Sequence, residues 1–414
     1  MQTVLQSKYE LADERNLSVK ARSVSETADS MHKNQHHITY VTSADQTSTT
    51  FANASFINPT YAASVNSSFV NLSFANAASV NHCRTGYGET WAKVILFGEH
   101  SVVYGYSAVA LPLKNLRMRA TVHSCDYKSV LNPASIQNPA SSQSFDSQIT
   151  LSCLGFTGKL SKIPPRLSSI RTAIHAALEF VGWSGEPLQV ATESDFPPER
   201  GLGSSAAAAG AVIRAILDYY DVRASADELF ALTQSAERVA HGHPSGLDAT
   251  ATSASWPVRF QSGEFARMDI TMRAWLVLAD SGCKGMTRVT VEAIHSRLET
   301  NPVAVDAQLE ELGALAVAAE DDLALGRAED MGTRMIRAHQ ILADLGVSTS
   351  QLDALVRTAC AHGALGAKLT GGGGGGCVIA LADSEDSAHC VSAALRNAGA
   401  CNTWIVNIGD SVIN

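Results

Sequence analysis

The chain has 414 residues, which is enough for two domains with substantial cores. Its formal net charge of −9 argues against a nucleic-acid-binding surface, and no apolar run reaches the length needed to span a membrane. The eight cysteines stand singly, without a Cys-x-x-Cys pair, a pattern typical of reduced cysteines. We therefore expect a cytoplasmic globular protein without nucleic-acid or membrane partners.

The first 88 residues differ in composition from the rest of the chain. No Asp, Glu, Lys or Arg occurs from residue 46 to residue 83, and Ser, Asn, Ala and Thr dominate. Such a segment lacks the apolar density that offsets the loss of chain entropy on folding. We predict a low-complexity, disordered extension over residues 1–88. The alternatives are a polar, aggregation-prone tail, an arm that binds a partner and an upstream region that is not translated.

A first folded domain is expected over residues 89–272. The hydrophobic pattern predicts strands over 93–97, 107–113 and 118–124, a loop over 132–147, an amphipathic helix over 166–181 and a strand over 188–194. Further along, Ser225-Ala226-Asp227-Glu228 forms a capping box and predicts a helix that runs to Ala240. Residues 256–270 predict a hairpin with its turn at Ser262-Gly263.

The most informative segment is Pro197–Ala206, which reads Pro-Pro-Glu-Arg-Gly-Leu-Gly-Ser-Ser-Ala. Glycines let a backbone turn its N–H groups toward a ligand, and a helix behind them, expected from Ala206, adds the positive end of its dipole. We therefore predict a phosphate-binding loop. A turn that only lets a helix pack on a strand is the alternative, and the Gly-Lys-Ser/Thr ending of a Walker A motif is missing. The predicted phosphate contacts are Gly201, Leu202, Gly203, Ser204, Ser205 and Ala206.

A second domain is expected over residues 273–414. Its predicted elements are a strand over 274–279, helices over 287–298, 303–323, 328–345 and 350–362, a strand over 377–381, a helix over 387–398 and a strand over 403–408. Six consecutive glycines, 371–376, precede the strand at 377. They form either a flexible linker or a tight loop between packed elements, and the apolar strand directly behind them favours the tight loop. The mixed order of strands and helices predicts an α+β fold.

Four segments in order resemble the motifs of the GHMP kinases, and within that superfamily the mevalonate kinase family. They are Lys93–Gly105, Pro197–Ala206, Glu237–Asp248 and Lys368–Cys377. The resemblance covers about residues 90–410. It implies an N-terminal domain like domain 2 of ribosomal protein S5 and a ferredoxin-like α+β C-terminal domain. It also implies ATP-dependent phosphorylation of the primary C5 hydroxyl of mevalonate, with Mg²⁺ as cofactor and a homodimer as the usual assembly.

The resemblance assigns roles to residues that are weak signals singly. Asp248 would be the general base, and Lys93 would stabilise its charge and the charge developing on the attacking oxygen. Ser205 and Glu237 would hold Mg²⁺. The implied substrate contacts are Glu99, His100, Ser245, Thr370 and Gly372. The alternatives are another small-molecule GHMP kinase, such as a phosphomevalonate kinase, galactokinase or homoserine kinase, and a catalytically inactive homologue that senses a ligand.

Three departures from the family pattern leave questions open. Trp91-Ala92 stands where Pro-Gly usually precedes the first lysine, which affects the turn but not the lysine. Arg200 adds a positive charge inside the phosphate loop, where it either strengthens phosphate binding or points to solvent. The segment 280–288 fits the family only loosely, so contacts to a substrate carboxylate stay unassigned.

Overall fold

The computed structural model describes residues 84–124, 142–241 and 244–409. The predicted disordered extension therefore lies outside the described residues up to residue 83, as does most of the predicted loop 132–147. Within the described ranges, no helix is long and apolar enough to cross a membrane.

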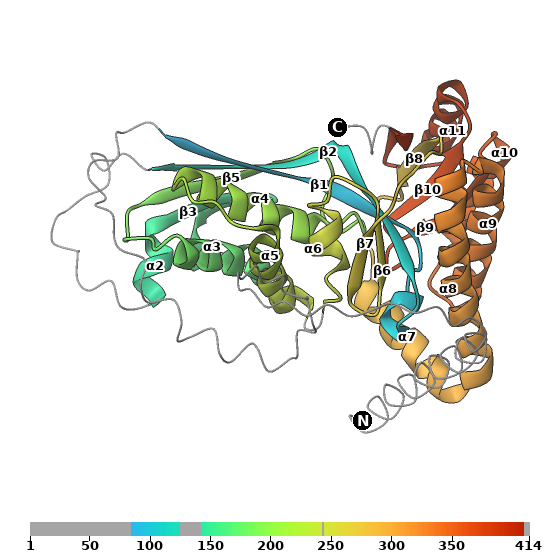
Figure 1. The fold of residues 1–414 in the computed structure, drawn as a ribbon, viewed down its shortest axis with the longest axis horizontal. Helices are drawn as coiled ribbons and strands as arrows, with labels where there is room; N and C mark the ends of the chain where they lie inside the picture. Colours follow the sequence, from blue (N-terminus) through green and yellow to red (C-terminus); the bar gives the residue numbers. More distant parts are fainter. Residues whose placement is uncertain (1–83, 125–141, 242–243, 410–414) are drawn as a thin grey trace, which may run out of the picture. The chain divides into compact units, whose positions relative to one another are not determined.

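In the N-terminal domain, a mixed sheet of seven strands forms among the described residues (Figure 1). The strands are β1 (Thr85–Phe97), β2 (Ala108–Ser124), β3 (Ile149–Cys153), β4 (Phe156–Lys159), β5 (Leu188–Ser194), β6 (Val258–Gln261) and β7 (Glu264–Arg267). Their order is β4-β3-β5-β2-β6-β7, with β1 paired to β2. β3 and β5 run parallel, and the other pairs are antiparallel. The predicted hairpin at Ser262-Gly263 is β6–β7.

Helices pack against this sheet and against each other. They are α2 (Ser142–Gln148), α3 (Ser168–Phe180), α4 (Ser204–Tyr219), α5 (Ala226–His241) and α6 (Leu247–Ala251). The capping box predicted at the start of α5 is present, because the Ser225 N–H donates to Glu228 Oε2 at 2.8 Å and the Glu228 N–H donates to Ser225 Oγ at 3.3 Å. α4 lies directly on β1 and β2 and carries an almost wholly buried apolar face.

β1 begins at Thr85, four residues before the expected start of the folded chain at Glu89. Gly86 and Gly88 hide this part of the strand from pattern analysis, since glycine normally weakens a strand. Here the helix explains them: a Cβ on Gly86 would lie 2.2 Å from Ala215 O, and one on Gly88 would lie 2.0 Å from Ala211 O of α4. The missing side chains let α4 approach the strand closely.

Two other expectations for this domain need correction. The strands expected over 107–113 and 118–124 belong to a single strand, β2. Its pairing with β1 shifts register opposite Trp91/Ala92. Part of the expected loop 132–147 is the helix α2. Local composition disfavoured that helix, but tertiary contacts hold it: Phe145 packs edge-on against Trp183, and buried Asp146 bonds Arg171 and His175.

The C-terminal domain contains an antiparallel sheet of four strands in the part of the chain that is described. The strands are β8 (Trp275–Asp280), β9 (Gly366–Thr370), β10 (Cys377–Ala382) and β11 (Asn402–Asn407), in the order β11-β8-β10-β9. The helices are α7 (Thr287–Thr300), α8 (Pro302–Leu325), α9 (Ala328–Asp344), α10 (Ser350–Ala361) and α11 (Glu385–Asn397). Each element predicted for this domain is present, with ends that differ by no more than two residues.

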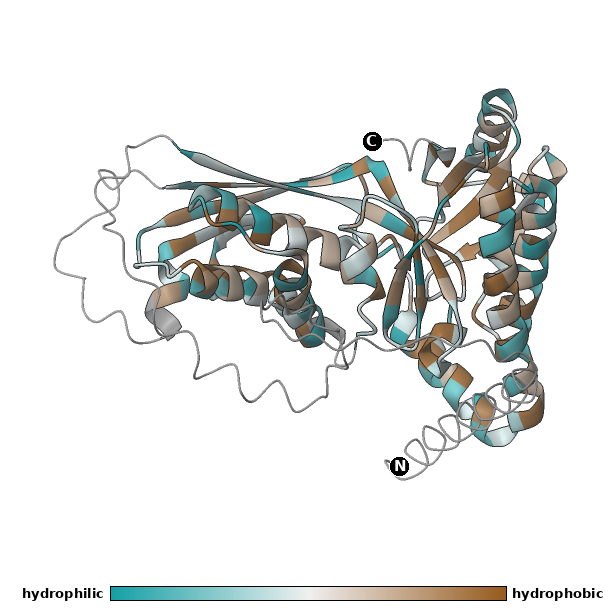
Figure 2. Cartoon of the chain, in the orientation of Figure 1, coloured by the Kyte–Doolittle hydropathy of each residue, from teal (hydrophilic) through white to brown (hydrophobic). Residues whose placement is uncertain are grey.

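The strand order of this second sheet is that of a ferredoxin-like fold, so the predicted α+β class and C-terminal architecture are confirmed. α9 and α10 pack on β9, and α11 packs on β8, β10 and β11. Along these helices hydrophobic and hydrophilic residues alternate in bands, as expected where one helix face lies on a sheet (Figure 2). β8 and β10 are apolar over nearly their whole length because other elements cover both of their faces.

Candidate active site

An ion pair between Lys93 and Asp248 lies at the centre of the site. Lys93 is on β1, one residue beyond Ala92, where the pairing with β2 shifts register, and an irregularity of this kind re-aims the side chains beside it. Asp248 is in the first turn of α6, which follows Gly246 in a left-handed conformation (φ 92°). The distance from Lys93 Nζ to Asp248 Oδ1 is 2.8 Å. The lysine side chain is 3% exposed and the aspartate side chain 40%, so a substrate can reach the carboxylate while the lysine stays buried behind it.

The phosphate loop joins β5 to α4 and lies against this pair. α4 begins at Ser204, two residues earlier than expected, because Gly203 takes a left-handed conformation (φ 74°) and turns the chain into the helix. The Lys93 N–H donates to Leu202 O at 3.0 Å, and a Cβ on Gly203 would lie 3.0 Å from Lys93 Cγ. The N-terminal end of α4 is therefore held beside the lysine, where an anion would be stabilised.

Ser205 and Glu237 meet behind the loop. Ser205 Oγ donates to Glu237 Oε1 at 2.6 Å, which joins the first turn of α4 to α5, and Glu237 is 2% exposed. A hydroxyl and a carboxylate are hard oxygen ligands, and Mg²⁺ is commonly held by one or two such groups together with substrate phosphates and water. The two side chains thus fit the metal predicted for this position. Ser169 on α3 adds a contact that the sequence did not suggest, with its Oγ 3.3 Å from Ser205 Oγ.

Glu99 and His100 follow β1 and face the C-terminal domain. Glu99 is buried and forms an ion pair with Lys368 of β9, and its Oε2 has no hydrogen-bond partner among the residues described. Burial raises the pKa of Glu99 and lowers that of Lys368, and their mutual attraction offsets part of both shifts. The sequence assigned no role to Lys368, although a lysine inside an otherwise apolar strand is a signal that it has a buried partner.

His100 is held as a neutral ring. Burial lowers its pKa to about 4, and its Nε2 lies 3.0 Å from Gly372 O. Because a carbonyl oxygen only accepts, Nε2 carries the proton and donates it to that oxygen. His100 itself has a left-handed backbone (φ 63°), which is uncommon for a residue with a side chain and is typical of functional segments.

The six glycines form a tight loop, as the strand behind them suggested. A Cβ on Gly372 would lie 2.2 Å from Thr287 Oγ1, and one on Gly373 would lie 2.2 Å from Val347 O. Gly372 O also accepts the hydroxyl of Thr290 at 2.7 Å. Thr370, just before the loop, donates its hydroxyl to Ile95 O of β1 at 2.8 Å. The loop is therefore packed between the two domains.

Ser245 behaves differently from the other candidates. It is exposed, and its Oγ accepts the N–H of Leu247 at 3.3 Å, which stabilises the turn into α6. Within the described ranges, no hydrogen bond of its side chain joins it to another candidate residue. A role for Ser245 in substrate binding stays a prediction.

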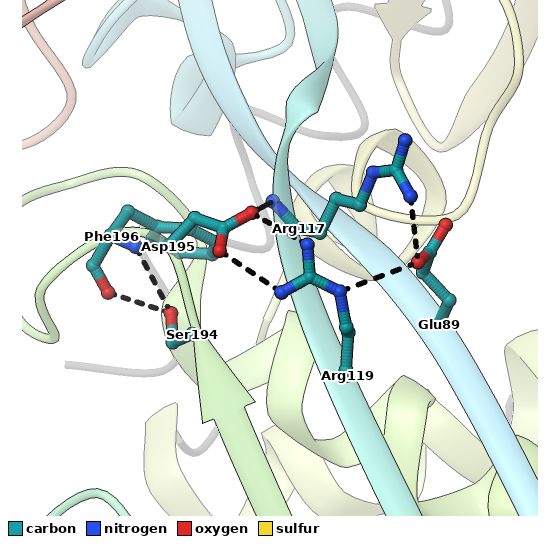
Figure 3. Close-up of polar contacts among 6 residues, drawn as sticks. All are labelled: Glu89, Arg117, Arg119, Ser194, Asp195 and Phe196. Carbon is teal, nitrogen blue, oxygen red and sulfur yellow. Dashed lines mark hydrogen bonds and ion pairs between the residues drawn. The ribbon is translucent and has the colours of Figure 1, made fainter.

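The phosphate loop is also fastened at its beginning, on the surface of the N-terminal sheet (Figure 3). Asp195 follows β5 directly and accepts two hydrogen bonds from Arg119 of β2, at 3.0 and 3.1 Å. The Arg117 N–H donates to the same carboxylate at 3.0 Å. Glu89 of β1 pairs with both arginines, at 3.5 and 3.8 Å. These partly exposed contacts tie the end of β5 to the neighbouring strands.

Comparisons with known proteins agree with this architecture. Residues 168–255 match the family model described as the GHMP kinases N terminal domain, and residues 309–401 match the GHMP kinases C terminal model. The fold is that of a GHMP kinase, a class that uses ATP as a substrate.

Individual relatives indicate which family of GHMP kinases the chain belongs to. A mevalonate kinase of Pyrococcus furiosus is 33% identical over 314 residues, which cover 74% of this chain and 92% of that protein. One of Pyrococcus horikoshii is 34% identical over 318 residues, covering 74% and 91%. The crystal structure of L. major mevalonate kinase in complex with R-mevalonate superimposes with a TM-score of 0.66 at 25% identity, covering 80% of this chain and 98% of that one. The chain belongs to the mevalonate kinase family.

Proposed function

We propose that the protein transfers the γ-phosphoryl group of ATP to the primary C5 hydroxyl of mevalonate and forms 5-phosphomevalonate. The observation that carries this proposal is the Lys93–Asp248 pair, with its accessible carboxylate held against the glycine loop at the start of α4. The names of the similar proteins support the choice of substrate. Phosphoryl transfer needs an oriented hydroxyl and neutralised phosphate charge, and this site offers groups for both.

In the proposed reaction, the Asp248 carboxylate accepts the proton of the C5 hydroxyl. The oxygen then forms a bond to the γ-phosphorus while the bond from that phosphorus to the β,γ-bridging oxygen breaks, and ADP leaves. Lys93 is 2.8 Å from the base, so it orients the carboxylate and stabilises negative charge on the attacking oxygen. The general base and the phosphate-binding groups therefore come from different parts of the chain.

The phosphates are held by the loop, in this proposal, through backbone N–H groups of residues 201–206 and the dipole of α4. Ser205 and Glu237 would hold Mg²⁺, whose chemistry is to neutralise the phosphate oxygens during transfer. On the acceptor side, Glu99, His100, Thr370 and Gly372 line the contact between the domains and would orient mevalonate. Ser245 would contact the substrate from the turn before α6.

A coupled ADP-release assay with mevalonate, phosphomevalonate, galactose and homoserine tests the proposal. We expect turnover that depends on Mg²⁺ and is confined to mevalonate. Preferred turnover of one of the other acceptors would point to another small-molecule GHMP kinase. Binding of ATP or mevalonate without turnover of any acceptor would point to an inactive, ligand-sensing homologue.

We also propose that the kinase body starts with β1. Of the predicted domains 1–88, 89–272 and 273–414, only the boundary between the first two then changes. It moves to the start of β1, because Thr85–Gly88 packs on α4. Deleting residues 1–83 should leave the kinase activity unchanged, whereas deleting residues 1–88 should lower the melting temperature. Cytoplasmic location and a homodimer remain predictions, and light scattering of the purified protein checks the dimer.

A further inference from the structure

Arg200 neither points to solvent nor stands free beside the phosphate loop. Its guanidinium forms an ion pair with Asp280 at the end of β8, in which Nε lies 2.8 Å from Oδ1 without the geometry of a hydrogen bond. Its Nη2 donates to Gly282 O at 3.2 Å. The two side chains are only 15% and 5% exposed. The residue before the first glycine of the loop is thus bound to the C-terminal domain. This differs from both alternatives that the sequence left open, in which Arg200 binds phosphate or points to solvent.

Glu199 makes a second link to the same place. Its backbone is left-handed (φ 61°), a conformation that is unfavourable for a residue with a side chain. Three contacts hold it there. Its N–H donates to Ser204 Oγ at 3.3 Å within the phosphate loop, while its carbonyl accepts the Gly285 N–H at 3.0 Å and its carboxylate pairs with Lys284 at 2.5 Å.

The segment that receives these contacts, residues 280–286, is itself bonded to the six-glycine loop. The Ser281 N–H donates to Gly376 O at 3.0 Å, the Gly376 N–H donates to Cys283 O at 2.9 Å, and the Met286 N–H donates to Gly373 O at 2.9 Å. Backbone and side-chain contacts therefore join three loops in series: the phosphate loop, the segment after β8 and the six-glycine loop. The contacts of Glu199 and Arg200 connect the phosphate loop of one domain to the glycine loop of the other.

The structure assigns Arg200 and Asp280 to a latch that sets the position of the phosphate loop from the C-terminal domain. Arg200 is then a positioning residue for phosphoryl transfer, acting through the backbone of the loop. This inference rests on the proposed function. The inference goes beyond that function because the C-terminal domain would determine the geometry of the phosphate site in the N-terminal domain.

A double-mutant cycle tests the latch with the full chain: Arg200→Gln, Asp280→Asn and both together. We expect each single variant to lower kcat about tenfold, because small misplacements of a reacting group are costly, with KM for ATP changed less than threefold. The double variant should lose no more than the worse single variant, since both break one interaction. Arg200→Lys should recover part of kcat. Arg337→Gln removes a more exposed arginine–carboxylate pair, between α9 and α8, and should keep the parental kcat.

Hydrogen exchange of the peptide that covers residues 196–206, measured without substrate, separates this inference from the proposed function. Exchange should become faster in both single variants even if the acceptor is not mevalonate. If Asp280→Asn does not fold, Asp280→Glu replaces it in the cycle.

Three outcomes would overturn the latch. The first is a large rise in KM for ATP in Arg200→Gln alone, which would place the guanidinium on the phosphates. The second is losses of kcat that multiply in the double variant. The third is parental kcat and exchange in all variants with only a lower melting temperature.

Discussion

Two lysine–carboxylate pairs lie near the site and have opposite surroundings. Lys93–Asp248 leaves its carboxylate 40% exposed, whereas both side chains of Lys368–Glu99 are at most 1% exposed. In the first pair the carboxylate can meet a substrate hydroxyl and exchange a proton with it. In the second pair burial raises the pKa of Glu99 and lowers that of Lys368. The attraction between the two groups opposes both shifts, so each charge is stabilised by the other. Exposure of the carboxylate, rather than the pairing, separates the pair proposed for catalysis from the pair that joins two domains.

The largest expected effect concerns the exposed pair. Asp248→Asn should lower kcat by roughly 10²–10⁴-fold, because the amide cannot accept the proton of the hydroxyl. Steady-state kinetics and nucleotide binding measured on the same preparation check this, and ATP affinity should stay near the parental value. Glu311→Gln, a carboxylate of α8 paired with Arg337, is the matched control and should keep full activity. An active Asp248→Asn enzyme would move the general base elsewhere.

Loss of the lysine from the buried pair should lower stability, apart from any effect of Glu99 on substrate binding. Lys368→Met leaves Glu99 buried without its partner and should lower the free energy of unfolding by about 3–5 kcal/mol. Urea unfolding followed by circular dichroism measures the change. Adding Glu99→Gln to this variant should restore much of the loss because no uncompensated charge remains. If the double variant were as unstable as the single one, packing of the lysine stem rather than its charge would hold the domains together.

A pH effect follows from His100, next to the buried pair. Its folded pKa of about 4 lies below the ordinary value of 6.5, so between these values the unfolded chain binds a proton that the folded one does not. Stability should therefore fall as pH decreases from 6.5 to 4, with up to about 3 kcal/mol from this residue. Unfolding at several pH values, compared between the parent and His100→Gln, isolates the contribution. Parallel curves for the two proteins would contradict a neutral, buried His100.

The smallest effect is expected for the exposed network in Figure 3. Arg119 and Asp195 are each about one-third exposed, and pairs of this kind contribute at most about 1 kcal/mol. Arg119→Gln should therefore change the free energy of unfolding far less than Lys368→Met does, and 0.5 M NaCl should reduce the difference further. A loss as large as that of the buried pair would show that exposure does not rank these interactions.

Much of the fold followed from local patterns. Most elements of the C-terminal domain were predictable because its helices have one apolar face and the strands β8 and β10 are apolar runs, but the strand β9 was not predicted. The N-terminal strand Thr85–Gly88 and the helix α2 were not, since glycines weaken the strand pattern and polar residues weaken the helical one. In both places the tertiary partner supplies what the local sequence lacks, namely α4 for the strand and Trp183 for the helix.

The candidate site was predictable in its residue types but not in its contacts. The four motifs name Lys93, Asp248, Ser205 and Glu237, and the structure brings these into two pairs at 2.8 and 2.6 Å. Lys368, Ser169 and Asp280 received no role from the sequence. Their partners come from distant segments or from the other domain, and a single sequence does not show which residues these partners are.

By itself, then, the sequence determined the order of the elements, the glycine loop before a helix and the family to which the chain belongs. These depend on local preferences, such as left-handed glycine conformations and the spacing of apolar residues. Only the tertiary structure decided that Arg200 binds Asp280, that Glu99 is buried against Lys368 and that Asp248 stays open to solvent. Burial and ion pairing are properties of chain segments brought together by folding, and they fix which of several similar charges can do chemistry.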